Sequence, residues 1–431
     1  MKNIKQDRIA IVDGLRTPIA KAGGKYKNIE AEYLGARVVN ELAYHVDLDF
    51  DIYDELIVGN VSQPGHAANI ARVIALLAGF NEELPAYTVH RNCASGMESI
   101  TTAASKLYAG YGEVYMCAGV ESMSNIPLLH SKKMQNFFGA MFQARTVFAK
   151  LQLLKELRPS YLKPIIGLMQ GLRDPTTGLM MGDTAEILAQ DFGIGQSEQD
   201  KFALASHLKA AKAQQEGKFL DEIIPMVYDD SKITEDDDGI RASQSMQALG
   251  KLRPFFDKKN GTVTAGNSSQ ISDAAAAVVV MKESRAKELN IEPLGYMSAF
   301  SYAGLDPKRM GLGPYYATAK LLSETKLSMN DFDLIELNEA FSVQVLANIK
   351  AFESKSYGKI HLNSSKALGT IDESILNVNG GSVALGHPVG MTGTRLVIHT
   401  LKELRRRNKN RGLATLCIGG GQGASLLLEV S

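Results

Sequence analysis

The sequence predicts an α/β fold made of two similar halves, and two observations predict it. Strand-like and helix-like runs alternate in residues 8–122 and again in residues 271–430. Such alternation is typical of a mixed, largely parallel sheet with helices packed on its faces. Short runs in the two parts also resemble each other, as DELIVGN at 54–60 and DLIELNE at 333–339 do. Two copies of one α/β unit would produce this internal similarity.

The alternating pattern breaks between the two parts, from about Asn125 to Gly182, and a polar, acidic loop follows later. A chain of 431 residues is also longer than one hydrophobic core usually holds. We therefore expect three regions. They are the first α/β half at 1–125, a loop domain at 126–257 that contains a basic amphipathic insert at 126–181, and the second α/β half at 258–431.

Within the first part, β-branched and aromatic residues predict strands, and apolar residues three and four apart predict helices. The predicted runs are strand 8–14, helix 31–45, strand 54–61, helix 68–79, strand 84–90, helix 97–110 and strand 113–122. The helix at 97–110 ends at a glycine, which is a usual stop signal.

The same signals return after Gly261. The predicted runs are a strand and a helix within 271–290, strand 293–304, helix 314–325, a strand and a helix within 333–352, a helix within 382–407 and strands within 412–430. The corner between strand and helix at Asn338 resembles the corner at Cys93. We therefore expect these two corners to correspond in the two halves.

The composition excludes several classes of protein. With 45% hydrophobic and 22% charged residues the chain is an ordinary globular protein, and its formal net charge of zero attracts neither nucleic acid nor an anionic surface globally. Three cysteines form no disulfide framework and no C-x-x-C pair, so we expect a reducing compartment and no metal. We find no apolar signal-peptide core and no run that could span a bilayer, and we expect a cytoplasmic protein.

The stretch VHRNCASGMES places Cys93 where a predicted strand meets a predicted helix. The first N–H groups of a helix lack partners, and the helix dipole favours negative charge there. Both effects lower the pKa of a thiol and make it a better nucleophile. A small buried hydrophobe is the other interpretation, since most free cysteines are of that kind.

Three further blocks carry side chains suited to chemistry. LNEAF contains Asn338, NGGSVALGHPVGMTGTR contains His387, and CIGGGQG contains Cys417 and Gly419. Glycines near His387 let backbone approach a ligand closely, and the N–H groups of a glycine run can face an anion. Taken singly, each block also has a structural interpretation: a satisfied core histidine, a sharp turn, or a helix N-cap for Asn338.

Taken together and in this order, the blocks resemble the signature blocks of the thiolase family, the enzymes of 3-ketoacyl-CoA cleavage and condensation. The resemblance covers nearly the whole chain and includes DGLRTPI, AEYLGA, RNCASGM, MGDTAE, GQSEQD, KLRPFF, GTVTAGNSSQISDAAAA, NEAF, GGSVALGHPVGMTG and CIGGGQG. It implies the thiolase fold, in which two similar α/β halves form five layers, α-β-α-β-α, with an inserted loop domain. It also implies dimers as the basic assembly.

The resemblance implies a role for each matched side chain. Cys93 would be the nucleophile that accepts the acyl group, and His387 would accept the proton of its thiol. Cys417 would protonate the acetyl-CoA enolate and then deprotonate the incoming CoA. Cys117 matches no catalytic role, and its strand context predicts packing in the core.

The resemblance also implies how the two oxyanions and CoA are bound. One oxyanion would be bound by His387 and by a water held by Asn338, and the other by the backbone N–H groups of Cys93 and Gly419. Two less closely matched positions would touch the pantetheine and nucleotide of CoA, namely Ser269 in GNSS and Arg241 in GIRAS. CoA is then a substrate, and no redox or organic cofactor is implied.

The insert has a pattern of its own. Its basic residues are Lys132, Lys133, Arg145, Lys150, Lys155, Arg158, Lys163 and Arg173, and its acidic residues are Glu156 and Asp174. Apolar residues recur at helical spacing, namely Met134, Phe138, Met141, Phe148, Leu151 and Leu154. This pattern predicts a basic amphipathic helix, with a second short helix beginning at Pro164.

Two interpretations of the insert are open. It packs on its own domain or across a dimer, or its segment 132–173 makes peripheral contact with an anionic membrane or docks a partner subunit. The insert resembles in position the extra segment of trifunctional-enzyme β-subunits and related bacterial degradative thiolases. That resemblance implies membrane association and docking of a hydratase/dehydrogenase chain. That branch usually has His where this chain has Asn338, which is a departure.

We therefore expect a 3-ketoacyl-CoA thiolase of fatty-acid β-oxidation that forms a homodimer or tetramer and binds no nucleic acid. The alternative is an acetoacetyl-CoA thiolase that acts in the condensing direction. A β-ketoacyl synthase would lack a second catalytic cysteine such as Cys417. A non-catalytic scaffolding homologue should have lost Cys93, His387 or Cys417, and the chain retains all three.

Overall fold

The computed structural model describes residues 7–431, which form two compact units. One unit contains the chain up to Asn125 together with Asp174–Ser431, and the other is Ile126–Arg173. The smaller unit lies within the predicted insert at 126–181. The predicted domain limits remain predictions, and residues 1–6 of the first predicted region lie outside the described residues.

The larger unit is built on one ten-stranded sheet. Its strands follow in the order β12 (Leu334–Leu337), β13 (Arg411–Ile418), β14 (Gln422–Glu429), β11 (Gly295–Gly304), β1 (Ile9–Arg16), β10 (Ser272–Lys282), β5 (Val114–Ser122), β3 (Glu55–Gly59) and β4 (Ala86–Val89), and β2 (Ala20–Lys21) pairs with β10. β1 pairs with β10 on one side and with β11 on the other, so it joins two half-sheets.

The sheet is mixed, but the prediction of a largely parallel sheet is wrong. Among the described strands, β3 runs parallel to β4 and β5, and β12 runs parallel to β13. The other paired strands of the sheet are antiparallel. β13 and β14 form a hairpin whose turn contains Gly420 and Gly421 at φ of 88° and 81°. A hairpin needs only a short turn, whereas a parallel pair needs a crossover, and the sequence runs did not distinguish the two.

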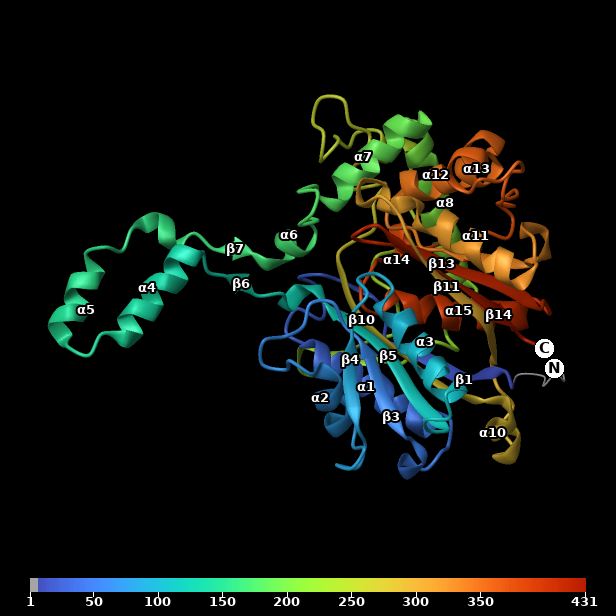
Figure 1. The fold of residues 1–431 in the computed structure, drawn as a ribbon, viewed down its shortest axis with the longest axis horizontal. Coiled ribbons are helices and arrows are strands. Elements are labelled where there is room, and N and C mark those ends of the chain that lie inside the picture. Colours follow the sequence, from blue (N-terminus) through green and yellow to red (C-terminus); the bar gives the residue numbers. More distant parts are fainter. Residues whose placement is uncertain (1–6) are drawn as a thin grey trace. The chain divides into compact units, whose positions relative to one another are not determined.

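Helices complete five layers, as the resemblance implied (Figure 1). The first outer layer holds α1 (Ala31–His45) and α2 (Ile70–Leu77), the central layer α3 (Ser95–Tyr108) and α15 (Thr392–Arg406), and the second outer layer α11 (Gly313–Thr325) and α12 (Ser342–Glu353). The apolar core is divided in the same way. One buried cluster lies under α1 and α2, one surrounds α3 and α15 between the half-sheets, and one lies under α11 and α12. Cys117 belongs to the central cluster, as predicted.

The two halves correspond differently from the prediction. α3 leads into β5, which lies parallel to β3, and α15 leads into β13, which lies parallel to β12. α3 and α15 are therefore the equivalent helices. The loop before α3 carries Cys93, and the loop before α15 carries His387, so the Cys93 corner corresponds to the His387 corner and not to the Asn338 corner. The sequence similarity of DELIVGN and DLIELNE matched β3 with β12 correctly but says nothing about the next corner.

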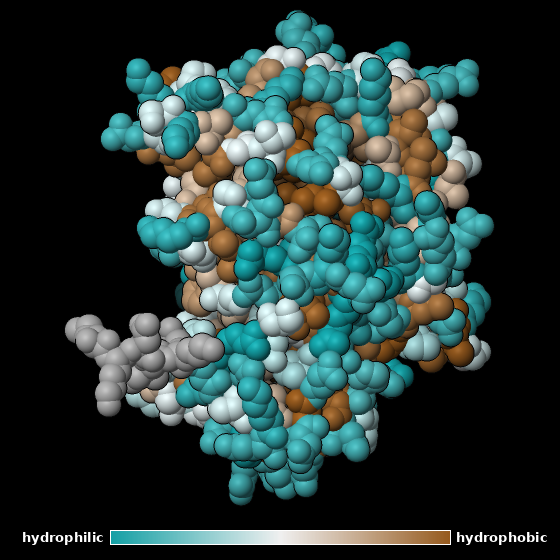
Figure 2. All heavy atoms as spheres, turned by 90° about the vertical axis from the view of Figure 1, so that its right-hand side faces the viewer, coloured by the Kyte–Doolittle hydropathy of each residue, from teal (hydrophilic) through white to brown (hydrophobic). Residues whose placement is uncertain are grey.

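Further elements surround this frame. They are α7 (Met181–Phe192), α8 (Gln196–Gln215), α9 (Met246–Leu249), α10 (Glu283–Glu288), α13 (Lys355–His361), α14 (Ser382–Leu385) and the hairpin of β8 (Met226–Tyr228) and β9 (Lys232–Thr234). In the view of Figure 2, hydrophilic side chains cover most of the surface and hydrophobic ones form separate patches. Scattered patches of this kind are normal on a surface that faces water.

In the smaller unit, two helices take the place of the one amphipathic helix that the sequence predicted. α4 (Lys132–Gln143) ends before Ala144, and α5 (Val147–Leu154) begins after Thr146. The Thr146 hydroxyl accepts a hydrogen bond from the Ala149 N–H at 3.2 Å, so it caps a new helix. A further helix, α6 (Gly167–Gly171), begins after the short β7 (Ile165–Ile166), which pairs with β6 (Leu128–Leu129). The prediction of a helix start at Pro164 is therefore wrong.

The predicted apolar stripe of the smaller unit is only partly buried. Of the predicted positions, Met134 is buried, whereas Phe138, Phe148, Leu151 and Leu154 are 47%, 71%, 54% and 48% exposed. Outside the predicted stripe, Phe137 is buried and Phe142 is 92% exposed. No helix among the described residues is both long and apolar enough to cross a bilayer.

Candidate active site

Cys93 lies in a tight corner between β4 and α3, as predicted. Asn92, the residue before it, has a φ of +45°. The Ser95 hydroxyl donates to the Asn92 carbonyl at 2.7 Å and accepts from the Arg91 N–H at 2.9 Å. These local bonds fix the backbone on both sides of the thiol.

The expectation that the helix start lowers the pKa of Cys93 is wrong for the resting protein. Burial is the largest effect and raises the pKa of the Cys93 thiol, to which the charge of Glu121 adds. The backbone N–H groups of Gly419 and of Cys93 itself act in the opposite direction, but their effect is smaller. Cys93 is therefore a thiol at neutral pH, and it needs a base to become a nucleophile.

His387 is held so that one ring nitrogen keeps a lone pair that can accept a proton. Its Nδ1 lies 2.7 Å from the Thr392 hydroxyl oxygen, and that hydroxyl lies 2.9 Å from the Pro388 carbonyl. The hydroxyl hydrogen goes to the carbonyl, so Thr392 accepts from an Nδ1–H, and Nε2 carries the lone pair. Burial, with the nearby charge of Arg395, lowers the pKa of His387 to about 3. The imidazole is therefore neutral.

The main chain at His387 depends on Gly386. Gly386 has a φ of 112°, and a Cβ there would lie 2.3 Å from the Ser272 Oγ. The His387 N–H then donates to the Gln270 carbonyl at 3.1 Å. A side chain at 386 would move the loop that carries the imidazole.

Asn338 presents its amide nitrogen to His387. The Ser382 hydroxyl donates to Asn338 Oδ1 at 2.6 Å, so Nδ2 faces His387 Nε2 at 3.5 Å. The Asn338 N–H also donates to the Thr415 carbonyl at 2.9 Å, which ties it to β13. α12 begins at Ser342, after Phe341, so the interpretation of Asn338 as a helix N-cap is wrong.

Cys417 lies next to Cys93. It is fully buried near the end of β13 and packs against Met310 and Ala340. Burial is the largest effect that raises its pKa, and the Cys93 thiol adds to it. Two residues later, the Gly419 carbonyl accepts a hydrogen bond from Asn92 Nδ2 at 2.7 Å. The glycine turn of β13 and β14 thus holds the second thiol against the first corner.

The starts of α3 and α15 are in direct contact, and glycines make this possible. A Cβ at Gly96 would lie 2.5 Å from Thr394 Oγ1, and a Cβ at Gly393 would lie 2.5 Å from the Met97 nitrogen. Only glycine fits at such distances. This contact brings together the loops of Cys93 and His387, which are almost 300 residues apart in the sequence.

Glu121 at the end of β5 joins two of the loops. It accepts hydrogen bonds from the Ser62 N–H at 3.0 Å and from the Gly390 N–H, in the His387 loop, at 2.9 Å. Burial raises the pKa of Glu121 to about 7. Glu121, Thr392 and Ser382 were not predicted from the sequence as parts of the site. The signal for Glu121 was a charged residue at the end of an otherwise apolar strand, VYMCAGVES.

Of the two residues expected at CoA, one lies near the site. The Ser269 N–H donates to the carbonyl of Ala340, two residues after Asn338, at 2.9 Å. Arg241 has an exposed side chain, and its N–H donates to His207 Nδ1 at 3.2 Å. No described contact joins Arg241 to Cys93 or His387.

One group of described side chains has the spacing of a metal site. Ligand atoms of Glu30, Glu32 and His66 lie within 4.8 Å of one another. Glu30 and Glu32 stand at the start of α1, where the helix dipole already favours carboxylates and disfavours a cation. His66 pairs with Glu32 at 2.8 Å. A helix start and an ion pair account for this group.

Comparison with known proteins agrees with this geometry. Residues 9–284 match the family model described as thiolase, N-terminal domain, and residues 291–430 match thiolase, C-terminal domain. The chain is 42% identical over 429 residues to a 3-ketoacyl-CoA thiolase of Yersinia enterocolitica, covering 98% of this chain and 97% of the relative. It is 41% identical over 425 residues to 3-ketoacyl-CoA thiolases of Escherichia coli, with coverage of 98% and 97%.

Solved structures give the same result. An acetyl-CoA acetyltransferase of Bacillus anthracis is 35% identical with a TM-score of 0.86, and 98% of each chain is covered. A human mitochondrial 3-ketoacyl-CoA thiolase in complex with CoA is 32% identical with a TM-score of 0.84, with coverage of 99% and 98%. The two family models together cover nearly the whole chain, and the relatives match it over nearly its whole length. The chain therefore belongs to the thiolase family.

Proposed function

We propose that the protein is a 3-ketoacyl-CoA thiolase, an acyltransferase that uses CoA to cleave 3-ketoacyl-CoA into acetyl-CoA and a shortened acyl-CoA in fatty-acid β-oxidation. The convergence of Cys93, His387 and Cys417 on one site carries this proposal. The relatives at about 40% identity that bear this name support it. The alternative is an acetoacetyl-CoA thiolase in the condensing direction, which the similarity to the acetyl-CoA acetyltransferase structures favours.

Cleavage begins with a proton transfer from Cys93 to His387. The thiol gives its proton to Nε2, whose lone pair is free because Nδ1–H is bonded to Thr392. The Cys93 thiolate then attacks the 3-keto carbon of the substrate. The C2–C3 bond breaks, the acyl group stays on Cys93 as a thioester, and the electron pair leaves with acetyl-CoA as an enolate.

Cys417 completes the first half of the reaction and starts the second. Its pKa is raised by burial, so it is a thiol that can protonate the enolate carbon. The resulting Cys417 thiolate takes the proton from the thiol of the incoming CoA. The CoA thiolate attacks the acyl thioester, and the released Cys93 sulfur recovers its proton from His387.

Two sets of donors bind the oxyanions of this cycle. Protonated Nε2 of His387 lies beside Asn338 Nδ2, 3.5 Å away, so both can serve one oxygen, directly or through a water. The N–H groups of Cys93 and Gly419 serve the other, and their effect on the pKa of the Cys93 thiol supports this assignment. No redox or metal cofactor takes part, because thiols and an imidazole supply each proton transfer.

Ser269 and Arg241 contact CoA in this proposal, at the pantetheine and the nucleotide. The position of Ser269 beside Ala340 and the exposed side chain of Arg241 support it. Arg241→Ala should raise KM for CoA several-fold and leave kcat unchanged. An unchanged KM would remove Arg241 from the proposal.

The decisive experiment for the activity compares two substrates. CoA-dependent cleavage of 3-ketohexadecanoyl-CoA and of acetoacetyl-CoA is measured with the wild type and with Cys93→Ala. Cleavage of the long substrate that is lost in the variant supports the proposal. Cleavage of acetoacetyl-CoA alone selects the short-chain alternative, and no cleavage of either rejects both.

We also propose that the protein is a cytoplasmic homodimer or tetramer. The strand β4, which leads into the Cys93 corner, lies at an end of the sheet, and no described strand pairs with its outer edge, which a second copy can cover. Sedimentation equilibrium tests this proposal, and a monomer at micromolar concentration would contradict it.

The unit Ile126–Arg173 makes a further contact, which we propose is with an anionic membrane surface. It carries eight basic residues and one acidic residue, Glu156. Phe142, Phe148 and Leu151 are exposed on α4 and α5. Basic charge together with exposed aromatic side chains is typical of segments that lie on anionic lipid. Docking of a hydratase/dehydrogenase subunit is the other candidate for this surface.

Co-sedimentation with vesicles of anionic phospholipid separates these candidates. The triple variant Phe142→Ser, Phe148→Ser and Leu151→Ser should not bind to the vesicles. Ile360→Ser, which removes a 75% exposed apolar side chain from α13 of the other unit, is the matched control and should bind as the wild type does. If the wild-type protein does not bind vesicles, the proposed membrane contact is wrong, and docking of a partner subunit remains as the candidate for this surface.

A further inference from the structure

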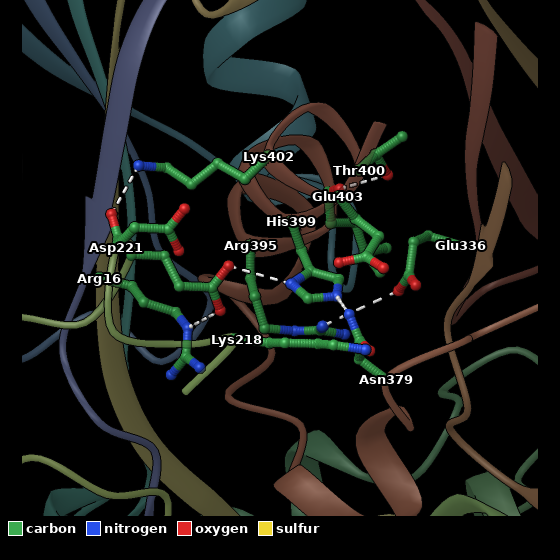
Figure 3. Close-up of polar contacts among 12 residues, drawn as sticks. Arg16, Lys218, Asp221, Glu336, Asn379, Arg395, His399, Thr400, Lys402 and Glu403 are labelled. Carbon is green, nitrogen blue, oxygen red and sulfur yellow. Dashed lines mark hydrogen bonds and ion pairs between the residues drawn. The ribbon is translucent and has the colours of Figure 1, made fainter. Parts of the chain in front are cut away.

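A buried charged pair stands behind His387 and Asn338. Arg395 on α15 is 2% exposed and Glu336 on β12 is fully buried. Arg395 Nη1 and Glu336 Oε2 lie 4.0 Å apart. Figure 3 shows the guanidinium pointing toward the carboxylate, within a polar network that also contains His399 and Asn379.

The pair closes a ring of contacts that includes the site. Glu336 is two residues before Asn338 and therefore faces the same side of the strand. Arg395 is three residues after Thr392 and therefore faces the same side of α15. Asn338 lies 3.5 Å from His387 and His387 lies 2.7 Å from Thr392. The ring thus runs from Asn338 through His387 and along α15 to Arg395, then across to Glu336 and back along β12.

The pair is poorly suited to stabilising the fold. A distance of 4.0 Å is too long for a hydrogen bond. Arg395 Nε and Nη2 and both carboxylate oxygens of Glu336 have no hydrogen-bond partner among the described residues. Burial lowers the pKa of Arg395 and raises that of Glu336. Buried pairs with incomplete hydrogen bonding commonly cost more than they return, and apolar replacements are often neutral or stabilising.

Arg16, a second buried arginine in the same network, shows the contrast. Its guanidinium donates to both oxygens of Asp237 at 2.7 and 2.9 Å and to Glu222 at 2.8 Å. These charge-assisted hydrogen bonds satisfy the Arg16 guanidinium, so a structural role accounts for Arg16. Arg395 has no such set of partners, so its presence beside His387 needs another explanation.

We propose that Arg395 and Glu336 are positioning residues, whose attraction holds the start of α15 and the end of β12 at the distance that aims His387 Nε2 and Asn338 Nδ2 at one point. The proposal rests on the proposed function, because that point is where the substrate oxygen is bound. Attraction without direct hydrogen bonds still resists separation of the two elements, since the interior screens charge weakly. Misplacement of catalytic groups by about 1 Å can reduce the rate about 100-fold.

The test separates positioning from stability. The variants are Arg395→Met, Glu336→Leu, both together, and Arg395→Lys, which keeps the charge. The double variant should keep or gain thermal stability, lose kcat by about 10- to 100-fold, and keep KM for CoA within about twofold because binding of CoA is untouched. Arg395→Lys should recover part of the lost kcat. Thr318→Val, which removes the buried bond between Thr318 and Ser425 at 2.9 Å, is the control and should lose stability but not kcat.

A second measurement does not depend on the activity. Alkylation of Cys93 by iodoacetamide reports whether His387 still accepts the proton, and it should slow in the double variant. If the wild type cleaves no 3-ketoacyl-CoA, the proposed function fails, while slower alkylation still supports the positioning role. A double variant with wild-type kcat and wild-type alkylation overturns the proposal. So does a loss of kcat that only follows a loss of folded protein.

Discussion

The two corners that face each other across the central layer have the same place in the two halves but opposite chemistry. Cys93 precedes α3 and His387 precedes α15. At a helix start, the dipole favours a negative charge and disfavours a positive one. For Cys93 the dipole would lower the pKa of the thiol, whereas burial raises it. Burial has the larger effect, so the pKa rises. For His387 burial is the largest effect, the nearby charge of Arg395 acts in the same direction, and the pKa falls to about 3.

Both side chains of the resting pair, Cys93 and His387, are therefore neutral. A thiolate beside an imidazolium is unfavourable in the closed site until the thiolate attacks a carbonyl, when the charge moves to an oxygen that Asn338 and His387 can bind. Reactivity of the thiol therefore depends on the base and on its tautomer, more than on the start of α3.

Cys93→Ala should have the largest effect. Removal of a nucleophile leaves only binding and oxyanion donors, and we expect kcat to fall by about 10⁴-fold or more. Formation of the acyl-enzyme, followed by mass spectrometry, should be absent. Cys117→Ala is the matched control, because Cys117 is buried in the central core and its thiol only donates to the Ser99 carbonyl at 3.4 Å. An acyl group on Cys117 or Cys417 would contradict the assignment.

His387→Asn should follow, with kcat lower by about 10²- to 10⁴-fold, the usual contribution of a general base. Alkylation of Cys93 should slow at pH 7, since the thiol then lacks its proton acceptor. His45→Asn changes an exposed histidine that pairs with Asp13 and should leave both measurements unchanged. An unchanged rate of alkylation would show that the start of α3 activates Cys93 alone, as the sequence first suggested.

The sequence predicted which side chains lie together in the site, but it did not predict whether they are charged. Cys93, His387, Asn338 and Cys417 stand in short blocks of unusual composition, and the resemblance of these blocks to one family placed them together. The pKa of Cys93 was predicted in the wrong direction, because the argument used the local helix start. Burial arises from the packing of α3 against α15, and this tertiary contact cannot be read from VHRNCASGMES.

The layers of the fold were predicted through the resemblance, and the strand directions were not. Runs of apolar residues look alike in parallel and antiparallel strands, so the position of β10 beside β5 had no local signal. The prediction for the helices of the insert was wrong for a local reason. Its apolar spacing predicted one helix, but Thr146 offers a cap that begins a second helix. A cap of this kind competes with helix continuation.

Thr392→Val tests the tautomer of the base. Without the hydroxyl, Nδ1–H loses its acceptor and Nε2 is no longer kept free of a proton. We expect kcat to fall by about 10- to 100-fold, which is less than for His387→Asn because the imidazole remains. KM for CoA should stay the same. Thr392→Ser keeps the hydroxyl and should restore most of the rate, and a serine variant as slow as the valine variant would assign the loss to packing.

The smallest effect concerns stability as a function of pH. The pKa of His387 is about 3 in the folded protein against an ordinary value of 6.5. As the pH falls below about 6.5, the unfolded chain gains a proton that the folded protein does not take up, so stability is full above 6.5 and falls toward 3. Each such group contributes at most about 1.4 kcal/mol per pH unit. His387→Asn should therefore reduce the loss of stability between pH 6.5 and 5, measured by urea unfolding, whereas His45→Asn should not. Equal slopes for the wild type and His387→Asn would mean that His387 takes up a proton in the folded protein as readily as in the unfolded chain, and the lowered pKa of His387 would then be wrong.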